Sequence, residues 1–351
     1  MRLMVVHPGA SWATHDVHVG VVEGLKANGV EVVEWRLDGR MAMAHNWLHY
    51  LWRQQKKVRA KDEVWAKPNQ ADAIHHATIG LVERALEARI TDVLIITAMF
   101  IPLARIELMR RAGLRVWLLC TESPYQMDSE LIAAAACHGV WTNERSSVSQ
   151  FASVQPNAAY LRHAWREGVH DVLPTDDATD CDVFFCGSMF AERIAWLSAV
   201  DWTGINLHLY CRPQDLPVRS VLRKYLRGGV TPNKIMITLA KRSKIALNLF
   251  RAATVTAESL NPRCYELSAA GVCVVSDHRA EYAAKFPDAP IVTTPAEASA
   301  MLHSLLADQP RRATIAAAMR AAVAQDVWRV RAQELLGQLT AWQQTLSSQG
   351  V

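Results

Sequence analysis

The sequence lacks paired cysteines, long apolar runs and low-complexity tracts. Its seven cysteines are scattered without a C-x-x-C pair, which is typical of small core residues in a reducing compartment. No segment approaches the roughly 18 consecutive apolar residues of a membrane span. The apolar part of the N-terminal MRLMVVHPG is too short for the core of a signal peptide. We therefore expect a cytoplasmic protein without a membrane span.

A strong charge of either sign is also missing. The net charge is +4 and 21% of the residues are charged, a balance that favours anionic ligands but does not require a polyanionic partner. Half of the residues are apolar, so the chain can bury real cores. Its 351 residues are enough for two domains of ordinary size.

Short apolar runs alternate with helical patterns through the first half of the chain. Such alternation predicts an α/β fold with parallel sheets. We expect strands at residues 3–6, 30–35, 93–97, 115–119, 140–142 and 159–161, and helices at 17–27 and 103–111. Residues 41–70, rich in Trp, His and basic side chains, interrupt this pattern and are interpreted as an insertion on the first sheet.

The strand pattern begins again after a linker at residues 171–180 that contains Pro174 and several Thr and Asp residues. Further strands are expected at the CDVFFC segment and at 205–210, 245–250, 272–276 and 290–292, and a long closing helix at 327–346. We therefore predict a first domain at 1–170, a second at 181–330, and a closing helix at 331–351 that packs back on the first domain.

The most informative segment runs from Thr254 to Asp277. It places two carboxylates, Glu258 and Glu266, eight positions apart. Asn261-Pro262 marks a helix start between them, and Gly271 ends that helix before an apolar strand. A carboxylate inside such a helix can hold a ribose diol, and free amides at the helix start suit a diphosphate. The segment therefore predicts a nucleotide-sugar site.

Three cations near this segment are candidate ligands for the phosphates. Arg263 lies in the first turn of the helix, where a cation is unfavourable unless an anion is present; the alternatives are a solvated side chain or an ion pair with Glu266. Lys244 and Arg251 flank the strand IALNLF, and Arg251 is at the carboxyl end, where open sheets bind ligands.

Other polar residues are weaker candidates for the site. The loop from Gly9 through Ala10 and Ser11 opens a helix that carries Asp16 and His18. His15 and His18 have no third ligand at suitable spacing, so we expect no metal there. The triplet Asp180-Cys181-Asp182 fits a D-x-D metal motif but is interpreted as a loop-to-strand boundary.

Glu122 follows a strand at its carboxyl end. Two other features have more than one interpretation. His163 lies near the crossover between domains, where hinge packing is an alternative to chemistry. The basic run at 53–61 with interleaved tryptophans resembles a nucleic-acid face, but a solvated helix surface is the favoured interpretation.

Several motifs together resemble the GT-B glycosyltransferases, in particular the branch of the spore-maturation protein CgeB, which has relatives in actinobacteria and their phages. The resemblance rests on DVFFCG at Asp182–Gly187, KIALNLFR at Lys244–Arg251 and SLNPRCYELSAAGVCVVSD at Ser259–Asp277. It continues through the helical tail WRVRAQELL and the first-domain segments HPGASWATHDVHVG, CTESPY and YLRHAW.

The resemblance implies two Rossmann-like doubly wound domains facing a cleft, with the acceptor side in the first and the sugar nucleotide in the second. Glu266 would bind the ribose and Glu258 the transferred sugar. It implies a retaining, metal-independent transferase without a cofactor, using a nucleotide-diphosphate sugar, UDP-sugar being slightly favoured. The implied catalytic residues are Glu258, Glu122, Asp16 and His163; the donor site would include Glu266, Arg263, Ser259, Leu260, Asn261, Arg251, Lys244, Gly187 and Ser188; the N-terminal loop would add Gly9, Ala10, Ser11 and His18.

The acceptor and the exact reaction class stay open at this level. The acceptor is a glycan, a protein or DNA, including DNA bases or virion proteins if phage relatives are a guide. The fold is shared with nucleotide-sugar epimerases and glycan phosphorylases, and a binding relative without turnover is a further alternative. A monomer and a homodimer are equally compatible with the sequence.

Overall fold

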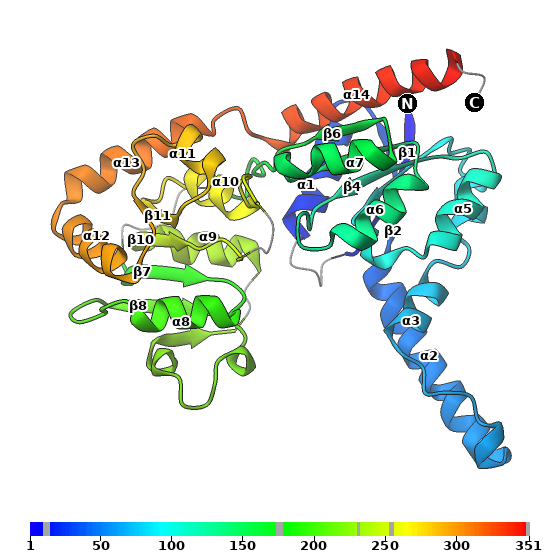
Figure 1. Ribbon diagram of the computed structural model, residues 1–351, viewed down its shortest axis with the longest axis horizontal. Helices are drawn as coiled ribbons and strands as arrows, with labels where there is room; N and C mark the ends of the chain where they lie inside the picture. The colour runs from blue at the N-terminus through cyan, green and yellow to red at the C-terminus, as the bar shows by residue number, and fades with distance from the viewer. Residues whose placement is uncertain (10–14, 173–177, 230–231, 253–255, 349–351) are drawn as a thin grey trace. The chain divides into compact units, whose positions relative to one another are not determined.

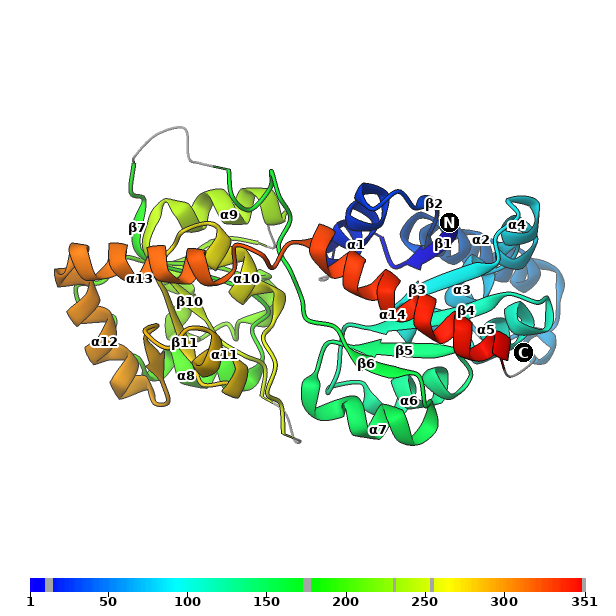
Figure 2. The same ribbon diagram turned by 90° about the horizontal axis from the view of Figure 1, so that it is seen from above.

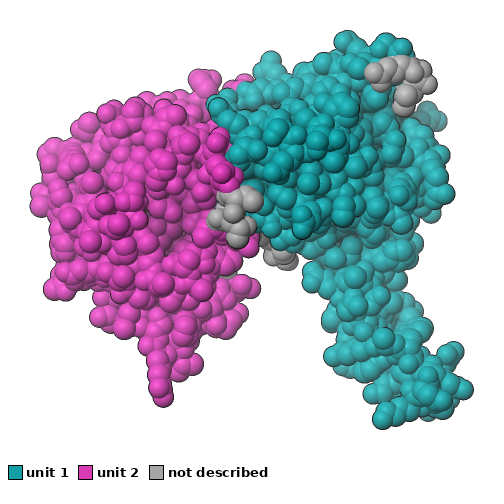
Figure 3. Space-filling model, in the orientation of Figure 1, with its two compact units in different colours: residues 1–162, 331–351 teal, residues 163–330 magenta. Residues whose placement is uncertain are grey.

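The chain folds into two compact units, which are coloured separately in Figure 3. Unit 1 comprises Met1–Arg162 and Arg331–Val351, and unit 2 comprises His163–Val330. The computed structural model describes residues 1–9, 15–172, 178–229, 232–252 and 256–348. The first domain was predicted to end at residue 170. In the structure the first segment of unit 1 ends at Arg162. Residues 173–177 of the expected linker lie outside the described residues.

Unit 1 holds a parallel six-stranded sheet in the order β2-β1-β3-β4-β5-β6 (Figure 1). Because β1 has β2 on one side and β3 on the other, the strand order switches at β1 and β3. Ligands of open parallel sheets bind outside the carboxyl ends of the strands at such a point. The elements are β1 (Arg2–His7), α1 (His15–Ala27), β2 (Glu31–Arg36), α4 (Leu81–Glu87), β3 (Asp92–Ile96), α5 (Leu103–Arg111), β4 (Arg115–Cys120), α6 (Met127–Ala135), β5 (Gly139–Thr142), α7 (Val148–Val154) and β6 (Ala158–Tyr160).

The centre of this sheet is buried on both faces. Leu3, Met4, Val5 and Val6 of β1 are each 0% exposed although successive side chains of a strand point to opposite faces. Helices therefore cover both faces, as a doubly wound sheet requires, and Figure 2 shows this covering from above. The last helix, α14 (Trp328–Ser348), takes part in it, because Trp342 packs on Trp141 with ring centroids 4.6 Å apart.

The segment 41–70, expected as an insertion, forms most of a helical arm that extends from the sheet of unit 1 (Figure 1). Its helices α2 (Leu37–Val58) and α3 (Gln70–Ala77) pack on each other. The connection between them is fastened to α2, since the Trp52 indole donates to the Trp65 carbonyl (3.2 Å) and the Trp65 amide donates to Gln55 Oε1 (3.3 Å). We call residues 37–79 the arm.

Unit 2 holds a second parallel six-stranded sheet in the order β12-β11-β10-β7-β8-β9. Its switch in strand order falls between β7 and β10, which pair directly. The elements are β7 (Cys181–Cys186), α8 (Ala191–Ala199), β8 (Leu207–Tyr210), β9 (Leu226–Gly228), α9 (Asn233–Lys241), β10 (Ser243–Asn248), α10 (Pro262–Ala269), β11 (Val274–Asp277), α11 (Ala280–Lys285), β12 (Ile291–Val292), α12 (Pro295–Ala307) and α13 (Gln309–Ala322).

The structure confirms the predicted α/β class with two doubly wound parallel sheets. The strand β9 was not predicted, because its three residues, LRG, form no apolar run. The predicted helix after Asn261-Pro262 is α10, and Gly271, with φ +72°, follows its last turn as expected. All seven cysteines are free thiols, six of them buried. None of the described helices combines the length and the apolar character needed to cross a bilayer.

Candidate active site

The first residues of α10 are fixed at the carboxyl edge of the unit 2 sheet by side-chain hydrogen bonds. Asn261 caps the helix, because its Oδ1 accepts the amide of Cys264 (3.0 Å). Its Nδ2 donates to Asn248 Oδ1 (3.0 Å), and Asn248 donates to Ser276 Oγ (2.9 Å). Asn248 and Ser276 lie near the carboxyl ends of β10 and β11. The helix start is therefore tied to the edge where parallel sheets bind ligands.

Glu266 lies one turn inside α10 and is only 4% exposed. Its Oε1 accepts a hydrogen bond from Asn233 Nδ2 (2.9 Å), and its Oε2 pairs with Arg263 Nη1 (3.0 Å). Burial raises the pKa of Glu266, but the charges of Arg263 and His170 and the hydrogen bond from Asn233 outweigh it, so the pKa lies below its ordinary value. The carboxylate is therefore held ionised in a polar cluster.

Arg263 adopts the ion pair with Glu266 that the sequence left open as an alternative to a diphosphate clamp. The same Nη1 also donates to Asn233 Oδ1 (2.8 Å), so Asn233 bridges both members of the pair. An ionised carboxylate has about four acceptor positions. Since Asn233 and Arg263 account for one contact on each oxygen, lone pairs of Glu266 remain for the two hydroxyls of a diol.

Two histidines of unit 2 belong to this cluster. His170 is fully buried, accepts the Arg166 amide at Nδ1 (2.9 Å) and has its Nε2 3.2 Å from Asn233 Nδ2. Burial lowers the pKa of His163 to about 4, with the charge of Glu266 acting in the opposite direction. His163 is therefore neutral at physiological pH and lies within electrostatic range of the carboxylate.

The loop before α10 is held by the start of α11. Glu281 accepts the amide of Leu260 at Oε2 (2.9 Å) and donates its own amide to the carbonyl of Glu258 (3.0 Å). Leu260 was expected to offer its amide to a diphosphate; because that amide already has a carboxylate partner, we no longer assign it there. Ser259 is buried and Glu258 is partly exposed at this loop.

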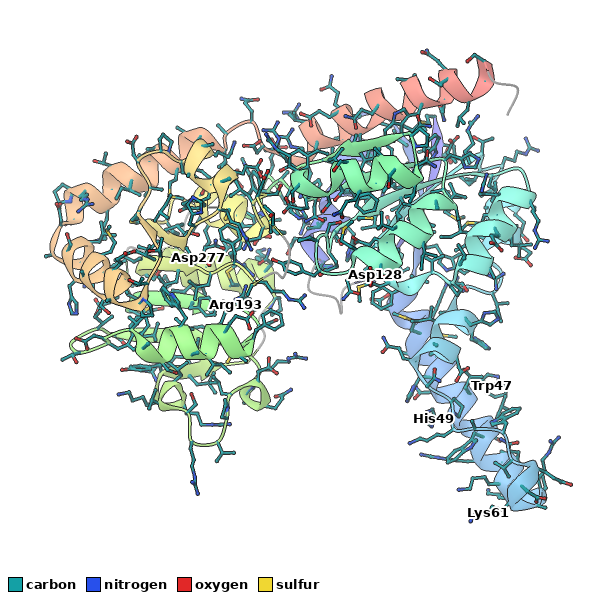
Figure 4. All side chains as sticks on the ribbon, viewed as in Figure 1. Trp47, His49, Lys61, Asp128, Arg193 and Asp277 are labelled. Atoms are coloured by element: carbon teal, nitrogen blue, oxygen red, sulfur yellow. The ribbon has the colours of Figure 1, made fainter. Side chains whose placement is uncertain are left out.

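A single arginine spans the switch point of the unit 2 sheet. Arg193, in α8, donates to the carbonyl of Ser188 (2.9 Å) and to that of Leu249 (2.6 Å). These carbonyls follow β7 and β10, the two strands between which the order reverses. Gly187 also lies here, with its amide donated to the Tyr210 carbonyl (3.1 Å). Arg193 was not among the site residues predicted from the sequence. Figure 4 labels it together with Asp277 of β11.

More guanidinium groups gather along this edge. Arg251 and Arg193 both lie over the ring of Phe190, at 4.8 and 5.2 Å from its centroid. Arg279 donates to the carbonyl of Arg251 (2.8 Å). Burial raises the pKa of Asp277 to about 6, although the hydrogen bond from the Phe250 amide and the charges of Arg279 and Arg193 lower it. The edge therefore concentrates positive charge where an anion would approach.

Lys244 does not belong to this edge. It lies near the amino end of β10 and forms an ion pair with Asp182 at 2.7 Å, so the structure does not bring it to Arg251, and we remove it from the donor site. Asp180 pairs with Arg242 at 2.9 Å. The triplet Asp180-Cys181-Asp182 is thus a loop-to-strand boundary with two ion pairs, as the sequence predicted.

In unit 1 the candidates lie at the carboxyl edge of the other sheet. Gly9 follows β1 with φ +89°, and a Cβ there would lie 2.1 Å from Asp38 Cγ, so only glycine fits. Asp16 is in the first turn of α1, and Glu122 follows β4. Ala10 and Ser11 lie outside the described residues.

His18 does not behave as an exposed site residue. It is fully buried, its ring stacks on His7 at 4.5 Å, and burial lowers its pKa to about 3. His15 Nδ1 lies 3.3 Å from His18 Nε2. His18 is therefore a neutral ring packed against His7.

Most of the partners that the structure adds to the site could not be predicted from the sequence. Asn233 and His170 hold Glu266 from positions remote in the chain, and Glu281 holds the loop before α10. Only Arg193 had a usable signal, because it follows the β7 turn closely in sequence, as ligand-binding residues of such sheets do.

Part of the chain matches a known protein family. Residues 193–337 match a family model described as glycosyl transferase-like, and this range includes Arg193, Arg251, Glu258 and Glu266. No curated protein matches the chain in sequence.

Solved structures with the same fold span nearly the whole chain. The trehalose-6-phosphate synthase OtsA gives a TM-score of 0.67 at 13% identity, over 97% of this chain and 99% of that one. A sucrose-phosphate synthase from Thermosynechococcus elongatus gives 0.67 at 11%, over 99% of both chains. A trehalose-6-phosphate protein from E. coli bound with UDP-2-fluoro glucose gives 0.62 at 14%, over 97% and 99%. Residues 193–337 therefore resemble a glycosyl transferase-like domain, and the chain shares the GT-B fold of these solved structures.

Proposed function

We propose that the protein transfers a glycosyl group from a nucleoside diphosphate sugar, held in unit 2, to an acceptor. The bond between the anomeric carbon and the diphosphate oxygen breaks, a bond to an acceptor atom forms, and the acceptor loses a proton. We place the chain in the CgeB-like group and expect retention of configuration without a metal. The observation that carries the proposal is the buried, ionised Glu266 at the start of α10 within the matched domain.

Glu266 is the proposed ligand of the ribose diol. A diol offers two hydroxyl donors, and hydrogen bonds to a charged acceptor are about twice as strong as those between neutral groups. Asn233 and Arg263 hold both oxygens in place before the ligand arrives. The site therefore needs little rearrangement to accept the nucleoside.

The proposed diphosphate ligands are Arg193 and Arg251. Both guanidinium groups lie against Phe190 at the carboxyl edge of the sheet, and Arg193 is fixed by two carbonyls. Cations held in place stabilise the charge that develops on the leaving diphosphate; one preorganised donor typically lowers the barrier by about 3 kcal/mol. Arg263 is a secondary candidate, since it is already paired with Glu266.

Four residues remain proposed for the sugar and the acceptor. Glu258 would contact the transferred sugar, and Glu122 and Asp16 of unit 1 are the proposed acceptor-side carboxylates. His163, neutral because its pKa is about 4, can donate or accept a hydrogen bond but does not supply a charge.

A thermal-shift panel tests the proposal. The full chain would be melted with UDP-, GDP-, ADP- and TDP-glucose, free glucose and inorganic phosphate. A donor at 100 times its Kd stabilises the chain by about 2.7 kcal/mol, so at least one nucleotide sugar should raise Tm by several degrees while glucose and phosphate do not. One of the similar structures holds UDP-2-fluoro glucose, so we expect the UDP-sugar to respond. No response to any nucleotide sugar would contradict the proposal.

A further inference from the structure

The arm of unit 1 presents apolar side chains to solvent on one face of α2. Met43, Trp47 and Tyr50 follow helical spacing and are 72%, 51% and 51% exposed. A helix that merely faces solvent carries polar residues on its outer side. Exposed apolar groups that lie together, in contrast, mark interaction sites.

These side chains surround a pocket of about 740 Å³. Its walls are Met43, Trp47, Tyr50 and Ile79, and the rings of Trp47 and Tyr50 stack with centroids 5.7 Å apart. Ala44 and Ala77 also line it and are only 1% and 2% exposed. Small buried residues below large exposed ones form a recess that is deep enough to receive an apolar side chain. We call this recess the socket.

A cationic segment begins one helical turn beyond the socket. Between residues 40 and 67 the chain carries seven Lys and Arg side chains and two carboxylates, a net charge of +5, whereas the whole chain is +4. The cations beyond Tyr50 lie at residues 53–67, and Figure 4 labels Trp47 and Lys61 along the arm. The complete arm, residues 37–79, also contains Asp38 and Asp72 and has a net charge of +3, so most of the net positive charge of the protein lies on the arm.

We propose that the arm docks an acidic polypeptide segment, which inserts an apolar side chain into the socket and places carboxylates against residues 53–67. Trp, Tyr, Met and Arg are the residues most enriched at the centres of protein interfaces, and Arg40, Met43, Trp47 and Tyr50 line this socket. Because cations are in excess here, charge complementarity requires a partner segment with a negative charge.

Other occupants fit these observations less well. A second copy would bring two arms of net charge +3 together, which costs energy through repulsion. Nucleic acid supplies phosphates and bases but no aliphatic side chain for a recess walled by Met43 and Ile79. A bilayer surface takes up protruding side chains and does not fill a recess whose lining includes the buried Ala44 and Ala77.

Peptide binding to the full chain tests the proposal. A display library of random linear peptides is selected against the protein without any sugar nucleotide. Recovered peptides should carry a large apolar residue with Asp or Glu on one side of it. Trp47→Ser should raise their Kd about 30-fold, a loss typical of a central interface residue. Lys56→Glu with Lys57→Glu should raise it about tenfold, with a smaller effect at high salt.

Matched controls separate the socket from general surface effects. Leu86→Ser changes an apolar residue of unit 1 with the same 51% exposure as Trp47, and Arg311→Glu with Arg320→Glu repeats the charge change in α13. Both should leave the Kd unchanged. Tyr50→Ser serves as a second socket variant, and equal melting temperatures confirm that each variant folds.

Three results would overturn the proposal: no enriched peptides, enriched peptides without acidic residues, or peptides that bind Trp47→Ser as well as the parent. Binding to oligo(dT) and to vesicles of phosphatidylcholine with phosphatidylglycerol should not depend on the socket. If the socket variants lose either kind of binding, the proposal is overturned in favour of nucleic acid or a bilayer. Donor binding is a separate readout: Glu266→Gln should still bind the peptides, and Trp47→Ser should still respond to the nucleotide sugar.

Discussion

At the scale of single residues, two buried glutamates show opposite solutions to the cost of burying a carboxylate. Glu266 keeps its charge because Arg263 and Asn233 contact its oxygens. Glu130 of unit 1 is 0% exposed, and its Oε2 accepts a hydrogen bond from the Ser123 hydroxyl (2.6 Å). Burial and the nearby charge of Glu122 raise the pKa of Glu130 to about 7, although Ser123 opposes them. An unpaired buried charge is expensive, so the group takes up a proton instead.

Glu130→Gln should therefore change the pH dependence of stability. In the folded chain the pKa is about 7, whereas an unfolded glutamate titrates near 4.3, so between these values folding takes up a proton. The wild type consequently loses stability, on the order of 3 kcal/mol, as pH rises from about 4.5 to 7. The Tm of the variant relative to wild type should rise through this window and level off above it.

Tm measured at intervals from pH 4 to 8 checks this prediction. Glu107→Gln, an exposed glutamate in α5 of the same unit, should give a constant difference over the whole range. A constant difference for Glu130→Gln as well would show that its carboxyl titrates normally.

At the scale of elements, α10 and the loop before it place the candidate donor ligands. Asn261 provides the N-cap and also reaches Asn248 at the end of β10. Thr294 provides the corresponding cap of α12 by accepting the amide of Glu297 (3.2 Å). The two caps belong to one unit, but only Asn261 lies beside Glu266.

Asn261→Ala and Thr294→Ala should therefore separate helix stability from donor binding. Each loses a capping hydrogen bond worth about 1 kcal/mol, so both should lower Tm by a similar amount. Asn261→Ala should in addition raise the Kd of the nucleotide sugar about tenfold, because the start of α10 is no longer tied to the sheet. Calorimetric titration of both variants measures this. Equal donor affinities would mean that α10 does not position the ligand.

The sequence predicts elements whose signals are local. Long apolar runs identify the central strands, and Asn261-Pro262 with Gly271 bounds α10, because cap, proline and glycine each act on the backbone nearby. The strand β9 could not be predicted, because its three residues at a sheet edge form no apolar run. The partners of Glu266 could not be predicted for another reason. Asn233 is 33 positions away from Glu266, and only the folded sheet brings α9 beside α10.

At the scale of the whole molecule, unit 2 is inserted between two parts of unit 1. The segments that enter and leave unit 2 are joined to each other, since Trp165 donates its amide to the Asp326 carbonyl (3.0 Å) and accepts that of Trp328 (3.3 Å). Its indole also donates to the Val323 carbonyl (2.8 Å). The sequence predicted a closing helix here, but the pairing of residues this remote depends on the tertiary fold.

The division into two units also separates the two proposed ligands. The sugar nucleotide is assigned to unit 2, at Glu266 and Arg193, and the acidic polypeptide to the arm of unit 1. Damage to one site should therefore leave binding at the other intact.

The most direct test of the account is the Kd of the best nucleotide sugar for Glu266→Gln, measured by calorimetry on the full chain. Glutamine keeps the size of the side chain but removes the charge that should receive the ribose hydroxyls. The expected result is a Kd at least about tenfold weaker than wild type, with no change for Glu192→Gln, an exposed glutamate of α8 in the same unit. Equal affinity of Glu266→Gln and wild type would contradict the assignment of the donor to this carboxylate.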